Sequence, residues 1–396
     1  MSRHDVSAGE QLAAYYAQVL DESRDLPSSA YREATYALTT RKLLKKLGMS
    51  GDDSFEDVPF AIPTFIDGCR LAMVNGGQGR DVLLAALMVG EEGSVVVVDP
   101  VAERLEDAKR FVECASVPEG MTLAPVEYVC ACGEHLPFDD ESIDSVAFNS
   151  TFNLAPDKEA LLREALRVLV AGGEIYVASV FASKRLDGGL ADDRVAVRNL
   201  LAGALYIEDF RRMLARLGVN CYRYMDQHDV SWAALRGSLS DAAVKELEAA
   251  ELSYRVVRTF KIFDYEDLCE KYGQVLTYKG NAPGCEQFID INDTHRFFTW
   301  DPLGVCGNTA AFVEQTRLAK YFEIEGDTSH HRGTYDYCLY CGTAIGETGK
   351  LSNMARHLAE LDLNRKRVND EVDAAGASGT GEPRCAVSGC AACSRV

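Results

Sequence analysis

A glycine-rich turn between two strand-like segments is the feature that most constrains how this chain can fold. The apolar run Arg70–Val74 leads into a turn that contains Gly77 and Gly79, and an amphipathic segment follows. The next apolar run, Ser94–Val98, ends at Asp99. In a doubly wound α/β sheet this order lets a nucleoside approach the bare backbone of the turn, and the acid accepts hydrogen bonds from the ribose hydroxyls. The pattern therefore predicts a nucleoside site; the alternative is a tight turn with Asp99 capping a helix.

The composition is that of an ordinary globular protein. Of the 396 residues, 47% are hydrophobic and 26% are charged, and this length predicts two or three compact units. The formal net charge of −20 argues against nucleic acid or an anionic membrane surface as the main partner. No apolar run approaches the roughly 20 residues that cross a bilayer. The first residues lack the hydrophobic core of a secretory signal, so we expect a cytoplasmic protein.

Strand-like and helix-like segments alternate from residue 69 to residue 180. The expected strands are 69–75, 94–99, 125–131, 143–149 and 173–180, and the expected helices are 80–88, 101–114 and 157–170. This alternation predicts a parallel sheet with helices on both faces. We expect Gly172 and Gly173 to close the helix 157–170, because a left-handed glycine commonly ends a helix.

The remaining segments predict four parts. Residues 1–62 are expected to form an N-terminal, substrate-side segment with a helix at 8–23 and a polar, proline-marked stretch after it. The α/β sheet is expected to occupy 63–235, with a helical stretch at 190–217 and a strand near 219–225. Aromatic, strand-like alternation at 254–263 and 274–278 predicts a smaller α+β unit over 236–341. Residues 342–396 are expected to be a helical and then disordered tail.

A second informative block follows the expected strand 125–131. Cys132 and Glu134 precede Leu136–Asp144, an LPF-D-x-S-x-D pattern. The block resembles class I S-adenosylmethionine-dependent methyltransferases, which have a Rossmann-like sheet and place an acid before this pattern near the adenine. The resemblance implies that Gly77, Gly79 and Asp99 hold the cofactor together with Cys132, Glu134 and Asn149, and that Asn149 lies at the mouth of the pocket.

The next segment narrows the resemblance. Asn149–Lys158 contains N-x-x-x-N-L-x-P-D-K, which is similar to the arsenite methyltransferases in particular. Matching segments continue to about residue 338; they are Gly203–Phe210, Phe260–Val275, Val305–Ala311 and Arg317–Phe322. The resemblance implies methyl transfer from S-adenosylmethionine to trivalent arsenic.

The cofactor loop departs from that family in two places. Met73 stands where the family has an acid, and Asn75 stands where it has its first glycine. Asparagine tolerates a positive φ better than most residues do, so we expect the turn to form. A lost charge-assisted hydrogen bond to the methionine moiety costs roughly 1.5–3 kcal/mol. We therefore expect cofactor binding that is weaker by about one or two orders of magnitude.

The family's arsenic-binding thiols are also replaced. Their positions fall on or next to Tyr31 and Val58, on Ser150 and on Leu200. A serine hydroxyl is a hard oxygen donor and is not ionised near neutral pH, so Ser150 cannot replace a thiolate toward a soft centre. Other thiols, Cys69, Cys130 and Cys132, lie at the expected strand ends, although a cysteine is often simply a buried apolar residue.

Five cysteines lie near the end of the chain: Cys338, Cys341, Cys385, Cys390 and Cys393. Their C-x2-C spacings could supply soft ligands to zinc or a metalloid. The long segment between the two groups makes closure entropically costly. Redox-active thiols and the absence of any function are the open alternatives.

Two hypotheses remain from the sequence. In the first, the chain is a methyltransferase whose acceptor is trivalent arsenic or another soft, thiol-bound centre; glutathione or the terminal thiols would then present the acceptor. We assign no catalytic residue, because the protein mainly aligns a soft nucleophile with the activated methyl group. In the second, the chain is an inactive pseudo-methyltransferase that acts as a binding or scaffold protein, since the acid at Met73 and the metalloid thiols are both lost.

Overall fold

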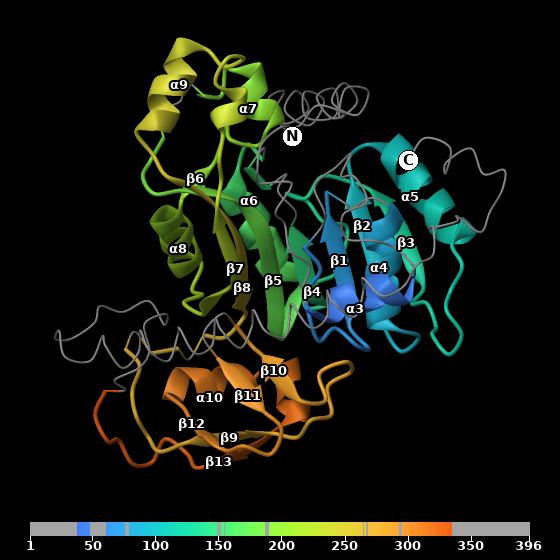
Figure 1. The fold of residues 1–396 in the computed structure, drawn as a ribbon. Coiled ribbons are helices and arrows are strands. Elements are labelled where there is room, and N and C mark those ends of the chain that lie inside the picture. Colours follow the sequence, from blue (N-terminus) through green and yellow to red (C-terminus); the bar gives the residue numbers. More distant parts are fainter. Residues whose placement is uncertain are drawn as a thin grey trace.

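An eight-stranded sheet with strand order β3-β2-β1-β4-β5-β8-β7, and with β6 paired to β5, forms the centre of the molecule (Figure 1). The computed structural model describes residues 38–47, 61–75, 79–148, 152–153, 155–186, 190–263, 265–266, 268–292 and 295–334. The strands are β1 (Arg70–Val74), β2 (Ser94–Asp99), β3 (Val126–Cys130), β4 (Ile143–Phe148), β5 (Leu169–Ala182), β6 (Leu205–Tyr206), β7 (Tyr222–Asp229) and β8 (Leu252–Phe260). Strands β1 to β5 run parallel, which confirms the predicted α/β class.

Helices cover both faces of the sheet, as the alternation predicted. They are α3 (Leu38–Lys46), α4 (Gly79–Val89), α5 (Ala102–Cys114), α6 (Lys158–Val168), α7 (Arg194–Arg198), α8 (Ile207–Arg216) and α9 (Asp241–Glu248), with a 3-10 turn at Ala233–Leu235. Leu71 and Met73 of β1 point to the core beneath α3, α4 and α5. Ala72 and Val74 point to the core beneath α6 and α8. Because successive side chains of a strand point to opposite faces of the sheet, the single buried strand β1 contributes to both cores.

Strand β8 lies in the main sheet. It was expected in the second unit, but it pairs antiparallel with β5 along its whole length and with β7 on its other side. The main sheet therefore continues to Phe260, past residue 235, and its last two strands are antiparallel. Val256 packs in one of the two cores to which β1 contributes, and Val257 packs in the other. The local periodicity of the sequence cannot show which sheet a strand joins.

The stretch before Pro63, expected to be polar and marked by prolines within a helical N-terminal segment, contains helix α3. Two local expectations change. The stretch 190–217 is not one helix, because α7 and α8 are separated by the strand β6. Gly172 does not close a helix: α6 ends at Val168, and β5 begins at the next residue. Gly172 has φ +71°, and a Cβ there would lie 2.0 Å from the carbonyl oxygen of Gln315, so the close approach of a distant segment excludes a side chain.

The expected helix 8–23 and the tail 342–396 lie outside the described residues.

The C-terminal unit packs against one end of the main sheet (Figure 1). It comprises β9 (Val275–Tyr278), β10 (Phe288–Asp290), β11 (Arg296–Phe298), β12 (Leu303–Gly304), α10 (Gly307–Glu314), a 3-10 helix (Arg317–Tyr321) and β13 (Phe322–Glu325). A third core of mainly aromatic and aliphatic residues fills it. This is the smaller α+β arrangement that the sequence predicted.

Buried charges join this unit to the sheet. Glu174 of β5 accepts a 2.7 Å hydrogen bond from Arg258 Nε, and both side chains are fully buried. Glu174 also contacts Arg317, whose guanidinium donates to the carbonyl oxygens of Phe65 and Thr64 at 2.7 and 2.9 Å. Because the buried charges need these partners, the cluster fixes how the two units meet.

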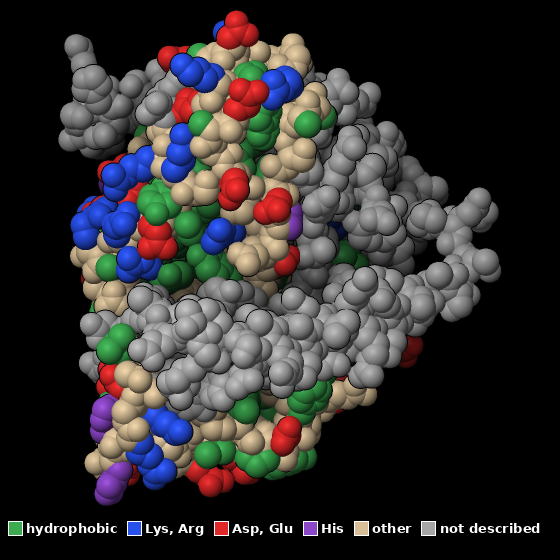
Figure 2. Space-filling model, turned by 60° about the vertical axis from the view of Figure 1, so that its left-hand side comes forward, with side chains coloured by type: hydrophobic (Ala, Val, Ile, Leu, Met, Phe, Trp, Pro, Cys, Tyr) green, Lys and Arg blue, Asp and Glu red, His purple; other side chains and the backbone are tan. Residues whose placement is uncertain are grey.

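The surface mixes charges of both signs. Figure 2 shows basic side chains interspersed with acidic ones on one face of the molecule. On α8 they form ion pairs, among them Arg211–Glu208 and Arg212–Asp209 at 2.7 and 2.9 Å. Within the described residues, no helix combines the length and the apolar character needed to span a bilayer.

Candidate cofactor site

The carboxyl ends of β1, β2, β3 and β4 meet at one edge of the sheet. The chain leaves β1 toward β2 and β3 on one side and crosses to β4 on the other. In open α/β sheets, ligands bind in the crevice at such a reversal. Asn75, Asp99 and Cys130 therefore lie at the edge where the sequence predicts the cofactor. Gly77 and Asn149, two of the predicted contacts, lie outside the described residues, as does Ser150.

Strand β1 is followed by an asparagine in a left-handed conformation. Asn75 has φ 56° and is buried, with 5% of its surface exposed. This confirms the expectation that asparagine accepts a positive φ at this position.

Gly79 has a packing role that the sequence did not suggest. It begins α4, and a Cβ there would lie 2.2 Å from the Cβ of Phe111 on α5. The glycine therefore permits the close approach of the two helices. Its contact with the cofactor stays a prediction.

Met73 contributes only apolar contact. It is fully buried, lies opposite Val97 and Ala147 in the register of the sheet, and belongs to the core beneath α4. A carboxylate at this position would be desolvated, which costs free energy unless a cation pairs with it. The structure therefore explains why methionine is tolerated when no charged partner is held here.

Asp99 lies at the end of β2 with its side chain almost completely buried. Its Oδ1 accepts a 2.9 Å hydrogen bond from Val101 N, and its Oδ2 lies 3.7 Å from Arg104 Nε. Burial raises the pKa of the carboxyl, whereas Arg104 and the Val101 amide oppose that shift. A carboxylate offers about four acceptor positions, so these contacts leave capacity for a ribose diol.

The loop after β3 lies directly over the end of β1. A Cβ at Gly133 would come within 2.7 Å of both Val74 Cγ1 and Leu161 Cδ2. Cys132 and Glu134, on either side of this glycine, are both half-buried. Burial raises the pKa of the Cys132 thiol, and the nearby Glu134 and Cys130 raise it further. Cys132 and Glu134 thus lie in the loop that packs on the end of β1, and their contact with the adenosine stays a prediction.

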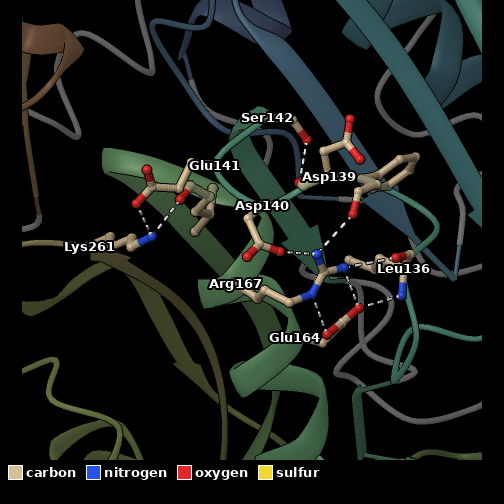
Figure 3. A network of polar contacts seen from close by, with 10 residues as sticks. Leu136, Asp139, Asp140, Glu141, Ser142, Glu164, Arg167 and Lys261 are labelled. Atoms are coloured by element: carbon tan, nitrogen blue, oxygen red, sulfur yellow. Dashed lines mark hydrogen bonds and ion pairs between the residues drawn. The ribbon is translucent and has the colours of Figure 1, made fainter.

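Arg167 of α6 holds the other end of this loop (Figure 3). Its guanidinium donates to the carbonyl oxygens of Leu136 and Phe138 at 3.0 and 2.9 Å and to Asp140 Oδ1 at 2.6 Å. Glu164 accepts both from Arg167 and from Leu136 N, at 2.7 and 2.9 Å. These bonds lower the pKa of the Glu164 carboxyl, chiefly through Arg167. Sequence reasoning missed this clamp; the only available signal was the pairing of Glu164 with Arg167 at helical spacing.

Asn153 and Leu200 lie on the predicted acceptor side of the site. Leu200, where a family thiol would fall, is buried and has φ 57°. The Asn153 amide donates 2.9 Å hydrogen bonds to the carbonyl oxygens of Leu200 and Val180. Gly203 has φ +80°, and a Cβ there would lie 2.1 Å from the carbonyl oxygen of Asn153 and 3.4 Å from Lys158 Nζ. This side therefore presents alkyl and amide groups where the sequence resemblance predicts a soft ligand in the family.

Most of the other described thiols are packed in the interior. Cys221, Cys269 and Cys306 are buried, and burial raises the pKa of Cys69 to about 11 and that of Cys285 to about 12. Over the described ranges, no group of three or more histidine, cysteine or acidic side chains could hold a metal ion. The terminal cysteines at 338, 341, 385, 390 and 393 lie beyond those ranges, so the metal or metalloid site predicted there stays a prediction.

Comparison with known proteins defines the class. Residues 74–177 match the methyltransferase domain family, and this segment covers the edge described above. The chain is therefore an S-adenosylmethionine-dependent methyltransferase with a Rossmann-like sheet, and S-adenosylmethionine is its cofactor.

More extensive similarity defines the family. An arsenite methyltransferase of Aquipseudomonas alcaligenes is 34% identical over 83% of this chain and 94% of its own length. The human arsenite methyltransferase is 26% identical over 81% of this chain and 84% of its own length. The crystal structure of an arsenic(III) S-adenosylmethionine methyltransferase from Chlamydomonas reinhardtii superposes with a TM-score of 0.65 at 32% identity, and covers 76% of this chain and 100% of that chain. The chain belongs to the arsenite methyltransferase family.

Proposed function

We propose that this methyltransferase acts on trivalent arsenic, or on another soft acceptor, that arrives already bound to thiols. The observation that carries the proposal is the contrast between the two sides of the site. Asp99, Cys132 and Glu134 keep a cofactor edge of polar groups, whereas Leu200 presents a buried alkyl chain where the family has a thiol. An alkyl group cannot ligate arsenic, so its thiolate ligands must come from elsewhere.

The residues fit S-adenosylmethionine by the chemistry of their donors and acceptors. Asp99 would accept from the ribose hydroxyls, and Cys132 and Glu134 would line the adenine. Arg167 keeps their loop over β1. When bound, the cofactor supplies an electrophilic methyl group. The chain contributes alignment and the exclusion of water rather than a proton transfer, so proximity supplies much of the rate.

The thiols would come from one of two sources. Glutathione in solution could deliver arsenic as a thiolate complex, or the terminal cysteines at 338, 341, 385, 390 and 393 could hold and relay it. Both supply the soft sulfur ligands that trivalent arsenic requires. We also propose that the methyltransferase unit spans 63–260, since β8 completes its sheet, and that the smaller unit spans 261–341.

Three measurements test the proposal. Calorimetric titration should detect binding of S-adenosylmethionine. Methylation of arsenite should then be measured with and without glutathione, and with all five terminal cysteines changed to serine in the full-length chain. We expect glutathione to raise the rate. A serine variant that loses activity only when glutathione is absent would identify the tail as the alternative source.

The second candidate is an inactive pseudo-methyltransferase. Met73 favours it, because this fully buried apolar side chain replaces the family's acid. Failure to bind S-adenosylmethionine at millimolar concentration would support this candidate and end the first. Binding without transfer to any thiol-bound arsenical would also support it.

A further inference from the structure

Two thiols flank the cofactor edge on the side away from the acceptor. Cys130 is the last residue of β3, lies opposite Asp99 in the register of the sheet, and is exposed. Its Sγ lies 3.6 Å from the carbonyl oxygen of Pro100. Cys132 follows two residues later and is half-buried.

The backbone between them places both side chains on one side. Ala131 N donates a 3.3 Å hydrogen bond to the carbonyl oxygen of Asp99, which continues the pairing of β3 with β2 beyond the end of the strand. In an extended chain, residues two apart project to the same face.

We infer that Cys130 and Cys132 form a dithiol site for trivalent arsenicals, and that occupation of this site excludes S-adenosylmethionine. Two sulfur atoms on one short segment are a chelating pair for a soft centre. The site differs from the acceptor side described above, which lies around Asn153 and Leu200. The inference depends on the position of the cofactor edge and not on the identity of the methyl acceptor.

The binding step balances without a redox partner. A monosubstituted arsenical, R–As(OH)2, exchanges its two hydroxides for the two sulfurs. Two As–S bonds form and two As–O bonds break, and each thiol proton leaves with a hydroxide as water. Arsenic stays trivalent. Because both protons leave within water, the raised thiol pKa does not oppose the net reaction.

Exclusion of the cofactor follows from where Cys132 lies. The Cys132–Glu134 loop packs on the end of β1, through Gly133, and forms the wall of the predicted adenosine pocket. An arsenic atom with its organic group, bridged between Cys130 and Cys132, would occupy the volume beside that wall. Accumulated trivalent arsenical would thereby inhibit the enzyme at its cofactor site.

The test uses phenylarsine oxide as the probe in the full-length chain with its five terminal cysteines changed to serine. S-adenosylmethionine affinity is measured by calorimetry with and without one equivalent of the probe, and adducts are counted by intact mass. We expect the probe to weaken cofactor binding at least tenfold, and a small dithiol such as 2,3-dimercaptopropanol to restore it. Cys130→Ser should lose both the adduct and the inhibition.

Cys114→Ser is the matched control. Cys114 is also exposed, but it ends α5, and a helix that follows a parallel strand ends at the opposite edge of the sheet. This variant should behave like the parent. Undiminished inhibition in Cys130→Ser, or an adduct at Cys130 and Cys132 that leaves cofactor affinity unchanged, would overturn the inference. If the parent binds no cofactor at all, the exclusion is refuted, and the adduct count alone decides whether the dithiol site exists.

Discussion

The side-chain amide of Asn153 donates a 2.9 Å hydrogen bond to the carbonyl oxygen of Leu200. The bond joins the segment after β4 to a left-handed residue of the acceptor-side loop, 47 positions later in the chain. A second bond from the same amide reaches Val180 of β5. Asn153 therefore ties that loop to the sheet at the place where the sequence resemblance predicts a family thiol.

Replacement of Asn153 by alanine should release this loop. We expect a loss of about 1–3 kcal/mol in the free energy of unfolding, because two buried carbonyl groups lose their donor. Methyl transfer should fall while S-adenosylmethionine affinity changes little, since Asp99 lies across β1 from this contact. Urea unfolding, calorimetry and initial rates provide the measurements. Asn220→Ala, at an exposed position, is the control, and equal losses in both variants would contradict the argument.

Removal of the charge of Glu174 should destabilise the junction of the two units. Glu174→Gln leaves Arg258 buried without its carboxylate, and breaking a buried ion pair in this way costs about 3–5 kcal/mol. Glu248→Gln removes the partner of Arg236 at an exposed site, where we expect a loss of at most about 1 kcal/mol. Chemical denaturation measures both. A similar small effect for the two variants would show that Glu174 does not stabilise the junction.

Loss of the Arg167 clamp should weaken cofactor binding. In Arg167→Met the loop from Leu136 to Asp140 loses its three contacts with the guanidinium, and Glu134 is no longer held over β1. We expect the dissociation constant for S-adenosylmethionine to rise about tenfold, equivalent to about 1.4 kcal/mol. Arg163→Met changes an exposed arginine on the same helix and should bind the cofactor like the parent. Calorimetry that gives identical constants for both variants would rule out the clamp.

Replacement of Met73 by aspartate, the acid expected from the family resemblance, should lower the stability of the protein and raise its affinity for S-adenosylmethionine. Met73→Asp places a carboxylate at a fully buried position, so we expect the protein without cofactor to lose about 3–5 kcal/mol. S-adenosylmethionine should bind more tightly, by roughly 1.5–3 kcal/mol, because its ammonium group then has an ionised partner. Met73→Leu conserves volume and should change stability by less than about 1.5 kcal/mol. Unchanged or weaker cofactor binding in Met73→Asp would contradict the prediction.

Lys158 should give the stability an alkaline dependence. Burial lowers its pKa from 10.5 to about 8, so between these values the unfolded chain binds more protons than the folded one. Stability then increases as pH increases across this window. Lys158→Met lacks this titrating group. The unfolding free energy of the parent should therefore increase relative to that of the variant from pH 8 to 10.5. The exposed Lys184→Met should track the parent; a Lys158→Met curve parallel to that of the parent would disprove the assignment.

Local patterns were sufficient for much of the sheet and its edge. Strand β2 was predicted with its observed bounds, because an uninterrupted run of valines bounded by a turn and an acid has few other conformations. The left-handed Asn75 was also predicted, since it depends on the backbone preference of a single residue. The membership of the arsenite methyltransferase family, expected from the Asn149–Lys158 segment, was confirmed by the comparisons.

By itself, then, the sequence determined the α/β class and the order of the segments that form the parallel strands, and it predicted the edge for the cofactor, because each depends on neighbouring residues. Only the tertiary structure decided where β8 lies, why Gly172 must lack a side chain, and how Arg167 and Asn153 hold the loops of the site. Those features are contacts between residues far apart in the chain. They depend on how whole elements pack, and no local preference of either partner specifies them.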